Sequence, residues 1–184
     1  MIMPNPYNQT VLILGGARSG KSSLAQKMAL ESGLPVVYLA TGVVTDMEME
    51  VRVQKHRESR PRSWITKETP YGNFSQMNEN WTGKAVLLDC ITFLVNNYLL
   101  RDGKEEIAYQ QILKELIFLF EKQKQENFYF LIVSNETGMG IVPEYPLART
   151  FRDLQGRINQ WLAVRATNVY IVIAGIPLKI KGEK

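Results

Sequence analysis

The sequence predicts an α/β domain with a mostly parallel, doubly wound sheet flanked by helices. Short β-rich segments alternate along the chain with longer segments of helical periodicity. Most of the β-rich segments are apolar at nearly every position, which is typical of strands buried on both faces of a parallel sheet. No internal repeat or linker interrupts this alternation. We therefore expect residues 1–184 to form a single domain.

Six segments are expected to be strands, and a seventh is expected at an edge of the sheet. The six are Val11–Leu14, Val36–Ala40, Ser63–Lys67, Ala85–Asp89, Phe128–Asn135 and Val169–Ala174. The segment Ile176–Lys181 is expected to add the edge strand near the C-terminus. No clear element is predicted for Pro70–Thr82, which is rich in Asn and Gly.

Four helices are expected between these strands, at Lys21–Glu31, Asp46–Glu58, Glu105–Glu126 and Leu147–Arg165. The last two carry apolar stripes at helical spacing, as needed for packing on a sheet. In open α/β sheets, ligands bind beyond the carboxyl ends of the strands. That rule selects Gly15–Ser22, Thr41–Thr45, Glu68, Asp89–Thr92, Asn135–Val142 and Gly175 as the segments that can form a site.

The composition is that of an ordinary globular protein, with 45% hydrophobic and 22% charged residues among 184. Disorder, collagen and a disulfide scaffold are excluded. The only cysteine is Cys90 and the only histidine is His56, so an intrachain disulfide and a metal site of several Cys and His ligands are excluded as well. No apolar run approaches the length of a membrane span, and the start of the chain lacks the basic region of a signal peptide. We expect a cytoplasmic protein.

The segment Gly15–Ser22 matches the phosphate-loop pattern G-x-x-x-x-G-K-[ST]. It follows an apolar strand and opens a helix, which is the context that the motif requires. Glycines allow backbone N–H groups to surround phosphate oxygens, and the helix N-terminus adds positive potential. In this pattern Lys21 reaches the β- and γ-phosphates, and Ser22 offers its hydroxyl to Mg²⁺. The sequence therefore predicts a nucleoside triphosphate site in a P-loop NTPase-like fold.

A second acidic element of such a site is expected at Asp89, at the end of an apolar strand. A carboxylate there would hold the Mg²⁺ shell together with Ser22. A GTPase switch is not indicated, because the chain has no Asn-Lys-x-Asp segment and Asp89 is followed by Cys-Ile-Thr. A small kinase or transferase remains.

His56 lies in a dense cationic segment. Val51–Arg62 contains five basic residues and one acid, whereas the rest of the chain is balanced at 17 basic and 17 acidic residues. The net charge of +4 is therefore local, which favours phosphates at one site over a diffuse surface for nucleic acid. Two interpretations stay open from the residues alone: a histidine acting on phosphorus, and a solvated helix face with an incidental histidine.

Several segments resemble the bifunctional adenosylcobinamide kinase/adenosylcobinamide-phosphate guanylyltransferases of cobalamin biosynthesis. The similarity extends from about Val11 to the C-terminus. It is carried by Gly15–Ser22, Tyr38–Thr41, Arg52–Pro61 with Trp64, Leu87–Thr92, Ser134–Pro143 with Ala148–Arg149 and Phe151–Asp153, Gly156–Gln160, and Gly175 with Lys179–Lys181. Two departures are small: Lys55 stands where some members have a second histidine, and Asp89 stands where some have Glu.

The resemblance implies two reactions at one site. The γ-phosphate of GTP or ATP goes to the aminopropanol hydroxyl of adenosylcobinamide. A histidine, here His56, then attacks the α-phosphate of GTP, and the GMP passes to adenosylcobinamide phosphate to give adenosylcobinamide-GDP. The basic neighbours of His56 would keep its imidazole neutral, and so nucleophilic, near neutral pH. A homo-oligomer, often a trimer, is implied, with neither nucleic acid nor a membrane span.

The motif and the resemblance together name the expected site. His56 and Lys21 are expected to be catalytic, and Ser22 and Asp89 to hold Mg²⁺. Nucleotide contacts are expected from Gly15, Gly16, Ala17, Arg18, Ser19, Gly20, Lys21, Ser22, Ala40, Thr41, Gly42, Arg57, Glu58, Ser59, Arg60, Glu68 and Asp89. A carboxylate such as Glu68 suits guanine, since it can accept hydrogen bonds from N1–H and N2–H.

Alternatives remain at this point. The segment Asn135–Gly140 is either a tight turn or a loop that binds the corrinoid or a neighbouring subunit. The protein as a whole has two competing hypotheses, a nucleotide-binding regulatory module without chemistry and a small P-loop kinase with an unrelated acceptor.

Overall fold

A seven-stranded sheet forms the centre of the protein, with the strand order β3-β2-β4-β5-β1-β6-β7. The computed structural model describes residues 8–43, 47, 54, 57–58 and 60–182. Neighbouring strands are parallel except for β6 and β7, which form an antiparallel hairpin at one edge. The strands are β1 (Thr10–Gly15), β2 (Val36–Ala40), β3 (Ile65–Glu68), β4 (Ala85–Asp89), β5 (Tyr129–Asn135), β6 (Asn168–Ile173) and β7 (Ile176–Lys181).

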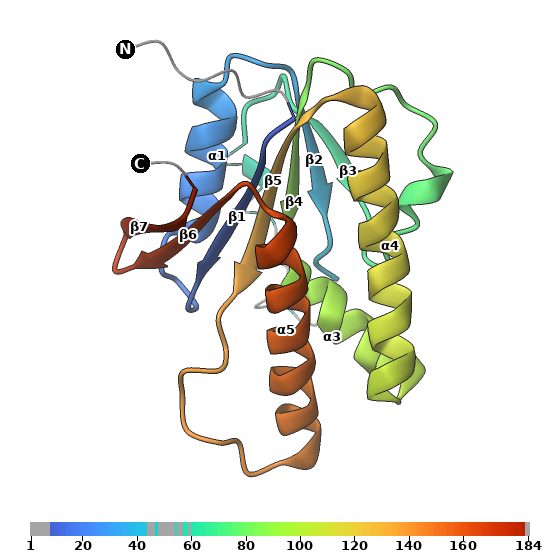
Figure 1. Ribbon diagram of the computed structural model, residues 1–184, viewed down its shortest axis with the longest axis vertical. Helices are drawn as coiled ribbons and strands as arrows, with labels where there is room; N and C mark the ends of the chain where they lie inside the picture. Colours follow the sequence, from blue (N-terminus) through green and yellow to red (C-terminus); the bar gives the residue numbers. More distant parts are fainter. Residues whose placement is uncertain (1–7, 44–46, 48–53, 55–56, 59, 183–184) are drawn as a thin grey trace.

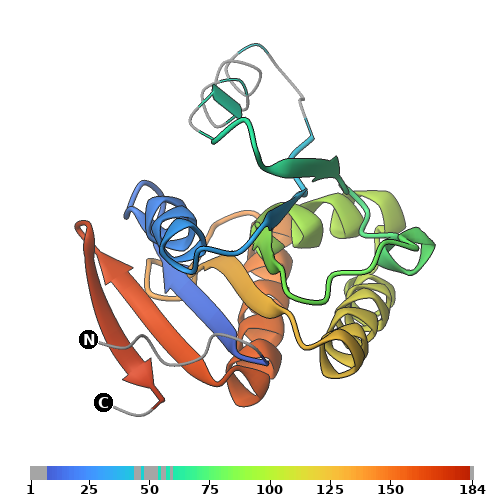
Figure 2. The same cartoon turned by 90° about the horizontal axis from the view of Figure 1, so that it is seen from above.

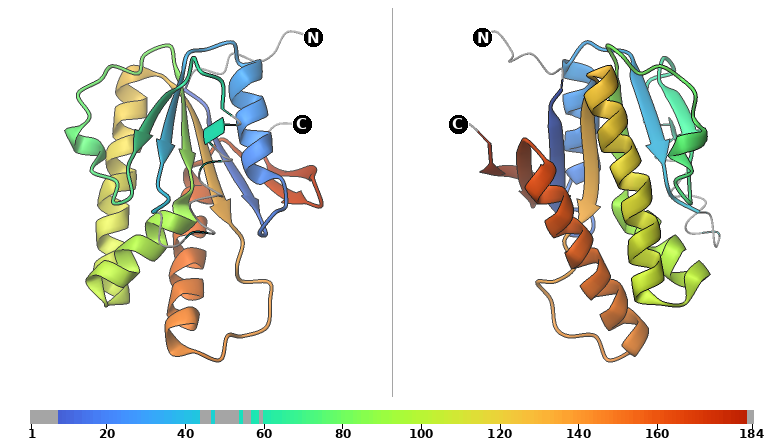
Figure 3. Two further views of the ribbon diagram at one scale, coloured as in Figure 1. Left: turned by 180° about the vertical axis from the view of Figure 1, so that it is seen from behind. Right: turned by 45° about the vertical axis from the view of Figure 1, so that its right-hand side comes forward.

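Helices cover both faces of the sheet (Figures 1 and 2). Helix α1 packs on one face, and α3, α4 and α5 pack on the other, as the view from behind and the turned view also show (Figure 3). The helices are α1 (Lys21–Glu31), α3 (Ile91–Asp102), α4 (Glu105–Glu126) and α5 (Pro146–Arg165), with a short 3-10 turn at Phe74–Gln76. Within the described part of the chain, no helix is long and apolar enough to cross a membrane.

Two hydrophobic cores lie on the two sides of the sheet, because alternate residues of a strand point to opposite faces. In β1, Val11 and Ile13 face the core under α1, whereas Leu12 and Leu14 face the core under α3, α4 and α5. Burial on both faces explains why these strands are apolar at nearly every position. The predicted doubly wound sheet and its C-terminal edge strand are confirmed.

Helix α3 is absent from the sequence-based prediction, which placed no element at Ile91–Asp102. The run Ile-Thr-Phe-Leu-Val is rich in β-branched and aromatic residues, which have low helix propensity. The helical signal is in the spacing instead, because the buried apolar residues recur every three or four positions, as Ile91, Leu94, Val95, Tyr98 and Leu99. Tertiary packing against α4 and α5 outweighs the weak propensity.

The other predicted elements differ little from the structure. Strand β3 covers Ile65–Glu68 and not Ser63–Lys67, a shift of the whole strand toward the C-terminus. Most of the predicted helix Asp46–Glu58 lies outside the described residues, and Met47, Gln54, Arg57 and Glu58, which are described, are helical.

Candidate active site

The phosphate loop joins β1 to α1 at the carboxyl edge of the sheet. Gly20 caps the helix with a φ of 97°, a left-handed conformation that favours glycine. At Gly15, a Cβ atom would lie 2.7 Å from the carbonyl oxygen of Val172 on β6, so the close approach of the two strands requires glycine. The turn between β6 and β7 supports the loop from outside, since the backbone N–H of Gly175 donates to the Ser19 carbonyl at 2.9 Å.

Lys21 lies at the start of α1, with only 9% of its surface exposed. Its Nζ donates to the carbonyl oxygen of Gly16 at 3.0 Å, so the ammonium folds back over the loop. This cation and the positive end of the helix act on the same small volume. An anionic phosphate chain is the ligand that such an arrangement favours.

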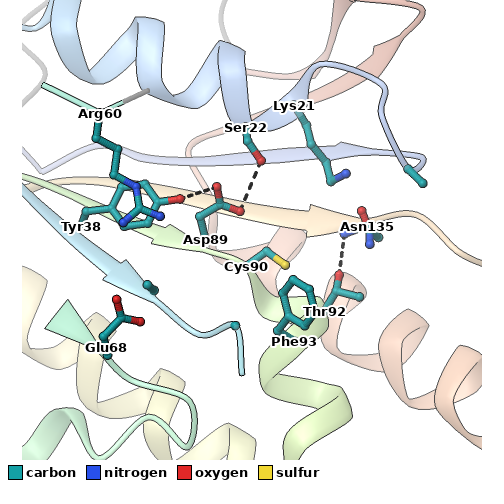
Figure 4. A pocket seen from close by; sticks show the side chains of 13 residues that line it. Lys21, Ser22, Tyr38, Arg60, Glu68, Asp89, Cys90, Thr92, Phe93 and Asn135 are labelled. Carbon is teal, nitrogen blue, oxygen red and sulfur yellow. Dashed lines mark hydrogen bonds between the residues drawn. The ribbon is translucent and has the colours of Figure 1, made fainter. Parts of the chain in front are cut away.

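Asp89, at the end of β4, is held from two directions (Figure 4). The hydroxyl of Ser22 donates to its Oδ1 at 3.3 Å, and the hydroxyl of Tyr38 donates to its Oδ2 at 2.7 Å. The hydroxyl of Ser22 and the carboxylate of Asp89 therefore converge on one point beside the phosphate loop. Hard oxygen donors of this kind suit Mg²⁺, which takes one or two protein ligands and completes its shell with water and phosphate oxygens.

Two ionisable groups next to Asp89 stay protonated at neutral pH. Burial is the main cause that raises the pKa of Tyr38 well above its usual value, and the negative charge of Asp89 is the second. The Arg60 guanidinium acts in the opposite direction. Burial, again with Asp89, raises the pKa of the Cys90 thiol to about 11. Tyr38 is therefore a stable hydrogen-bond donor, and Cys90 is a poor nucleophile because the thiolate is the reactive form.

Basic side chains border the other end of the cleft, near β2 and β3. The guanidinium of Arg60 lies 3.6 Å from the centre of the Tyr38 ring, which also stacks on Trp64 with ring centres 6.2 Å apart. Arg57 Nη2 donates to Glu68 Oε1 at 2.7 Å in an exposed ion pair. Both arginines follow His56 closely in the chain, and His56 itself lies outside the described residues.

One cleft brings together residues from four strands, β2 to β5, with residues of the phosphate loop, α1 and α3. It is lined by Ala17, Lys21, Ser22, Tyr38, Ala40, Gly42, Arg60, Glu68, Asp89, Cys90, Thr92, Phe93 and Asn135. Eight of the residues expected at the nucleotide site are among them: Ala17, Lys21, Ser22, Ala40, Gly42, Arg60, Glu68 and Asp89. The arrangement can hold a phosphate chain with its metal at one end and a planar or charged group beside Tyr38 and Glu68 at the other.

The other expected residues are placed differently. Gly15, Gly16, Arg18, Ser19 and Gly20 belong to the phosphate loop but do not line the cleft with side chains. Thr41 is fully buried, and its hydroxyl is engaged by Cys90, donating to the carbonyl oxygen at 2.6 Å and accepting from the N–H at 2.8 Å. Arg57 and Glu58 lie off the cleft lining, and Ser59, like His56, falls outside the described residues. The roles expected for these residues stay predictions.

Five lining residues are not among those expected to contact the nucleotide, although Asn135 belongs to the segment for which corrinoid binding was one alternative. Cys90, Thr92 and Asn135 fall in the strand-end segments that the sequence selects, so their position was foreseeable although their function was not. Tyr38 is a tyrosine in an otherwise aliphatic strand, which was the available signal for a polar task. Phe93 could not be placed without helix α3.

Comparison with known proteins decides the family. The model of the cobinamide kinase / cobinamide phosphate guanyltransferase family matches residues 11–180. The chain belongs to this family. The resemblance drawn from the motifs is thus confirmed for nearly the whole length of the chain.

Three curated relatives have similar sequence identities to this chain, at 39–41%. The bifunctional adenosylcobalamin biosynthesis protein CobP of Pseudomonas aeruginosa is 41% identical over 173 residues, which cover 94% of this chain and 97% of the relative. The bifunctional adenosylcobalamin biosynthesis proteins CobU of Escherichia coli and Salmonella typhimurium are 39% and 40% identical, and each match covers 93% of this chain and 99% of the relative.

Solved structures with a similar fold are distant in sequence. The flagellar accessory protein FlaH of Methanocaldococcus jannaschii has a TM-score of 0.55 at 13% identity, covering 97% of this chain and 80% of FlaH. The protein PH0250 of Pyrococcus horikoshii has a TM-score of 0.54 at 13% identity, covering 97% of this chain and 88% of that protein. At this identity the similarity shows the fold alone, and it agrees with the predicted mostly parallel α/β sheet.

Proposed function

We propose that this protein carries out both family reactions in the cleft described above. It phosphorylates the aminopropanol hydroxyl of adenosylcobinamide with GTP or ATP, and it then transfers GMP from GTP to adenosylcobinamide phosphate. The observation that carries the proposal is the shared cleft. The phosphate loop with Lys21 and Asp89 lies at one end, and Arg60, four residues after His56, lies at the other.

The phosphate chain of the nucleotide is proposed to bind at the phosphate loop. There, Lys21 exchanges its contact with the Gly16 carbonyl for β- and γ-phosphate oxygens, while backbone N–H groups at the start of α1 bind the remaining oxygens. Because the backbone donors are fixed before the ligand arrives, they stabilise the transferred phosphoryl group with little reorganisation cost.

Mg²⁺ is proposed to accompany the nucleotide, held by the Ser22 hydroxyl and the Asp89 carboxylate. Their oxygens already lie 3.3 Å apart next to the loop, which supports this assignment. When bound, the ion would neutralise charge that develops on the β- and γ-phosphates. Tyr38 keeps the carboxylate in place by its hydrogen bond to Oδ2.

GMP transfer is proposed to run through a covalent intermediate on His56. A neutral imidazole nitrogen forms a bond to the α-phosphorus of GTP, and the bond to the β-phosphate breaks to release pyrophosphate. The acceptor phosphate then takes the GMP and frees the histidine. Arg60 on the cleft wall and Arg57 beside it supply positive charge for the phosphorus centre.

Guanine is proposed to bind at the carboxylate of Glu68. That carboxylate is paired with Arg57 at 2.7 Å, with roughly half of both side chains exposed. Exposed ion pairs contribute little stability, about 0–1 kcal/mol. The Watson–Crick edge of a guanine can therefore share or replace this pair at small cost.

The assembly and location of the protein are further proposals that rest on the family and on composition. We expect a homotrimer, which light scattering on the purified protein would test, and a location in the cytoplasm, which the single cysteine favours. The expected partners are adenosylcobinamide, its phosphate, GTP and ATP, with no nucleic acid.

Product analysis with labelled nucleotides tests the function. The purified protein is incubated with adenosylcobinamide, Mg²⁺, and GTP labelled at either the γ- or the α-phosphate. We expect γ-label in adenosylcobinamide phosphate and α-label in adenosylcobinamide-GDP. Tight nucleotide binding without either product would contradict the proposal in favour of a regulatory module. Phosphorylation of a nucleoside or shikimate-like alcohol without GMP transfer would instead identify a small kinase with an unrelated acceptor.

A further inference from the structure

The strand order places β5 between the two strands that carry the phosphate-binding machinery. β5 pairs with β1, which leads into the phosphate loop, and with β4, which ends at Asp89. In register, Asn135 lies opposite Gly15, and Val133 lies opposite Asp89. Asn135 is two residues beyond Val133, so both occupy the same face of the sheet, the face covered by α1. The last residue of β5 therefore sits between the phosphate loop and Asp89.

The backbone at the end of β5 is fixed by hydrogen bonds to three different elements. Its N–H donates to Oγ1 of Thr92 on α3 at 2.9 Å, and its carbonyl accepts from Nδ2 of Asn159 on α5, also at 2.9 Å. The next residue along, Glu136, donates its N–H to the Gly15 carbonyl at 3.1 Å. Such support from several sides is what a side chain needs in order to be held in a productive geometry.

The side-chain amide of Asn135, in contrast to its backbone, forms no hydrogen bond with any residue that the structure describes. It lines the cleft, on the same side as the ammonium of Lys21 (Figure 4), and its Oδ1 is buried without a hydrogen bond. Buried amides are nearly always satisfied in folded proteins, because an unmade hydrogen bond is costly. On this rigid strand end beside a phosphate site, the two halves of the amide suit different ligand groups. The Nδ2–H groups can donate to a phosphate oxygen, whereas Oδ1 can only accept a hydrogen bond.

We propose that Asn135 is a catalytic residue of the kinase reaction and donates a hydrogen bond from its amide to an oxygen of the γ-phosphoryl group. The inference rests on the proposed function. In that step, the acceptor alcohol oxygen forms a bond to the γ-phosphorus, and the bond from this phosphorus to the β,γ-bridging oxygen breaks. The electron pair leaves with the nucleoside diphosphate, and the alcohol proton passes to solvent. Negative charge spreads over the equatorial phosphoryl oxygens, where a neutral donor stabilises it.

The placement also separates the two reactions. Arg60 and Glu68 lie near β2 and β3, at the end of the cleft proposed for the α-phosphorus and the guanine. Asn135 lies on β5, on the other side of β4 in the sheet. The contribution of Asn135 should therefore be large for γ-phosphoryl transfer and small for attack of His56 on the α-phosphorus.

The test compares both reactions in Asn135→Ala, Asn135→Asp and wild type, with thermal unfolding of each. Asn135→Ala should lower kcat of the kinase reaction on the order of 10²-fold, change KM for the nucleotide less than about threefold, and leave GMP labelling from α-labelled GTP within a few-fold. Asn135→Asp, which keeps the shape but replaces the donor by a carboxylate, should lower kinase kcat at least as much. Asn96→Ala, on α3 and away from the cleft lining, is the matched control and should leave both reactions unchanged.

Three results would overturn the inference. They are a kinase kcat within twofold of wild type in Asn135→Ala, full activity in Asn135→Asp, and a parallel loss of both reactions together with a lower unfolding temperature. A wild-type protein that transfers GMP but not phosphate, or neither, would overturn the proposed function itself, so the two failures are distinguishable.

Discussion

The hydroxyl of Tyr38, on β2, donates a 2.7 Å hydrogen bond to Oδ2 of Asp89, at the end of β4. The other carboxylate oxygen accepts from Ser22, so Asp89 is held from α1 and from β2 at once. The same tyrosine ring carries the guanidinium of Arg60 on its face. One aromatic side chain thus connects the proposed metal end of the cleft with the basic segment that follows His56.

Replacing Tyr38 by Phe should weaken the use of Mg²⁺ while preserving the fold. The ring and its contact with Arg60 remain, but Asp89 loses one of its two fixed partners. A hydrogen bond to a charged group contributes about 1.5–3 kcal/mol, so the Mg²⁺ concentration for half-maximal kinase activity should rise roughly tenfold. Titration of the initial rate with Mg²⁺ measures this. Tyr129→Phe, at the start of β5, is the control. An unchanged Mg²⁺ requirement in Tyr38→Phe would contradict the proposed role of Asp89 in holding Mg²⁺.

Replacing Glu68 by Gln should reduce the preference for guanine. A glutamine cannot accept from both N1–H and N2–H of the base, so KM for GTP in GMP transfer should rise about tenfold, whereas any ATP-dependent kinase rate should change little. Glu79→Gln is the matched control, because Glu79 also forms a partly exposed ion pair, with Lys67, but does not line the cleft. Steady-state kinetics with GTP and ATP measure the difference. An equal KM for GTP in the two variants would contradict a guanine site at Glu68.

Substitutions at the adjacent glycines Gly15 and Gly16 should differ sharply in their effect on stability. Gly15→Ala places a Cβ atom 2.7 Å from the Val172 carbonyl oxygen, which is closer than van der Waals contact allows. We expect a loss of about 1–3 kcal/mol in the free energy of unfolding. Gly16→Ala meets no atom within 4 Å and should change stability by less than about 0.5 kcal/mol. Urea unfolding of both variants measures the contrast, and equal stabilities would show that the strand spacing at Gly15 is adjustable.

Stability should fall in alkaline solution as buried acids ionise. Burial raises the pKa of Cys90 from an ordinary 9.0 to about 11, and the pKa of Tyr98 and Tyr129 from 10.0 to about 12. Between these values the unfolded chain loses protons that the folded protein keeps. The stabilisation is therefore complete below pH 9 and is lost as the pH rises toward 11, by about 2–3 kcal/mol for Cys90 alone.

Urea unfolding at pH 8 and pH 10.5 measures this loss. In Cys90→Ala, the free energy of unfolding should decline less over the same interval, because the variant lacks the thiol that ionises first in the unfolded chain. The variant should nevertheless start from a lower stability. A wild-type free energy of unfolding that is equal at the two pH values would contradict the prediction.

The parts of the site that follow one another closely in sequence were predictable. Lys21 and Ser22 are fixed by a motif whose backbone shape is local, and Asp89 follows from the rule that ligands meet strand ends. The hydrogen bond between Tyr38 and Asp89 was not predictable, because it depends on β2 lying next to β4. The place of Asn135 likewise depends on β5 lying between β1 and β4, and strand order is set by packing and not by any segment alone.

Helix α3 illustrates the same division. Its β-branched and aromatic residues have low helix propensity, whereas its apolar residues recur at helical spacing. The helix forms because this spacing lets its apolar residues pack into the core. With α3 unassigned, the position of Phe93 in the cleft, and the support that Thr92 gives to Asn135, could not be derived from the chain.

The most direct test of the central claim is covalent labelling with α-labelled GTP, followed by mapping of the modified residue. We expect acid-labile, base-stable label on His56 in the wild-type protein, and none in His56→Ala, which should retain kinase activity. Label of equal strength in His56→Ala, or label that maps to another residue, would contradict the claim that this histidine carries GMP between the two substrates.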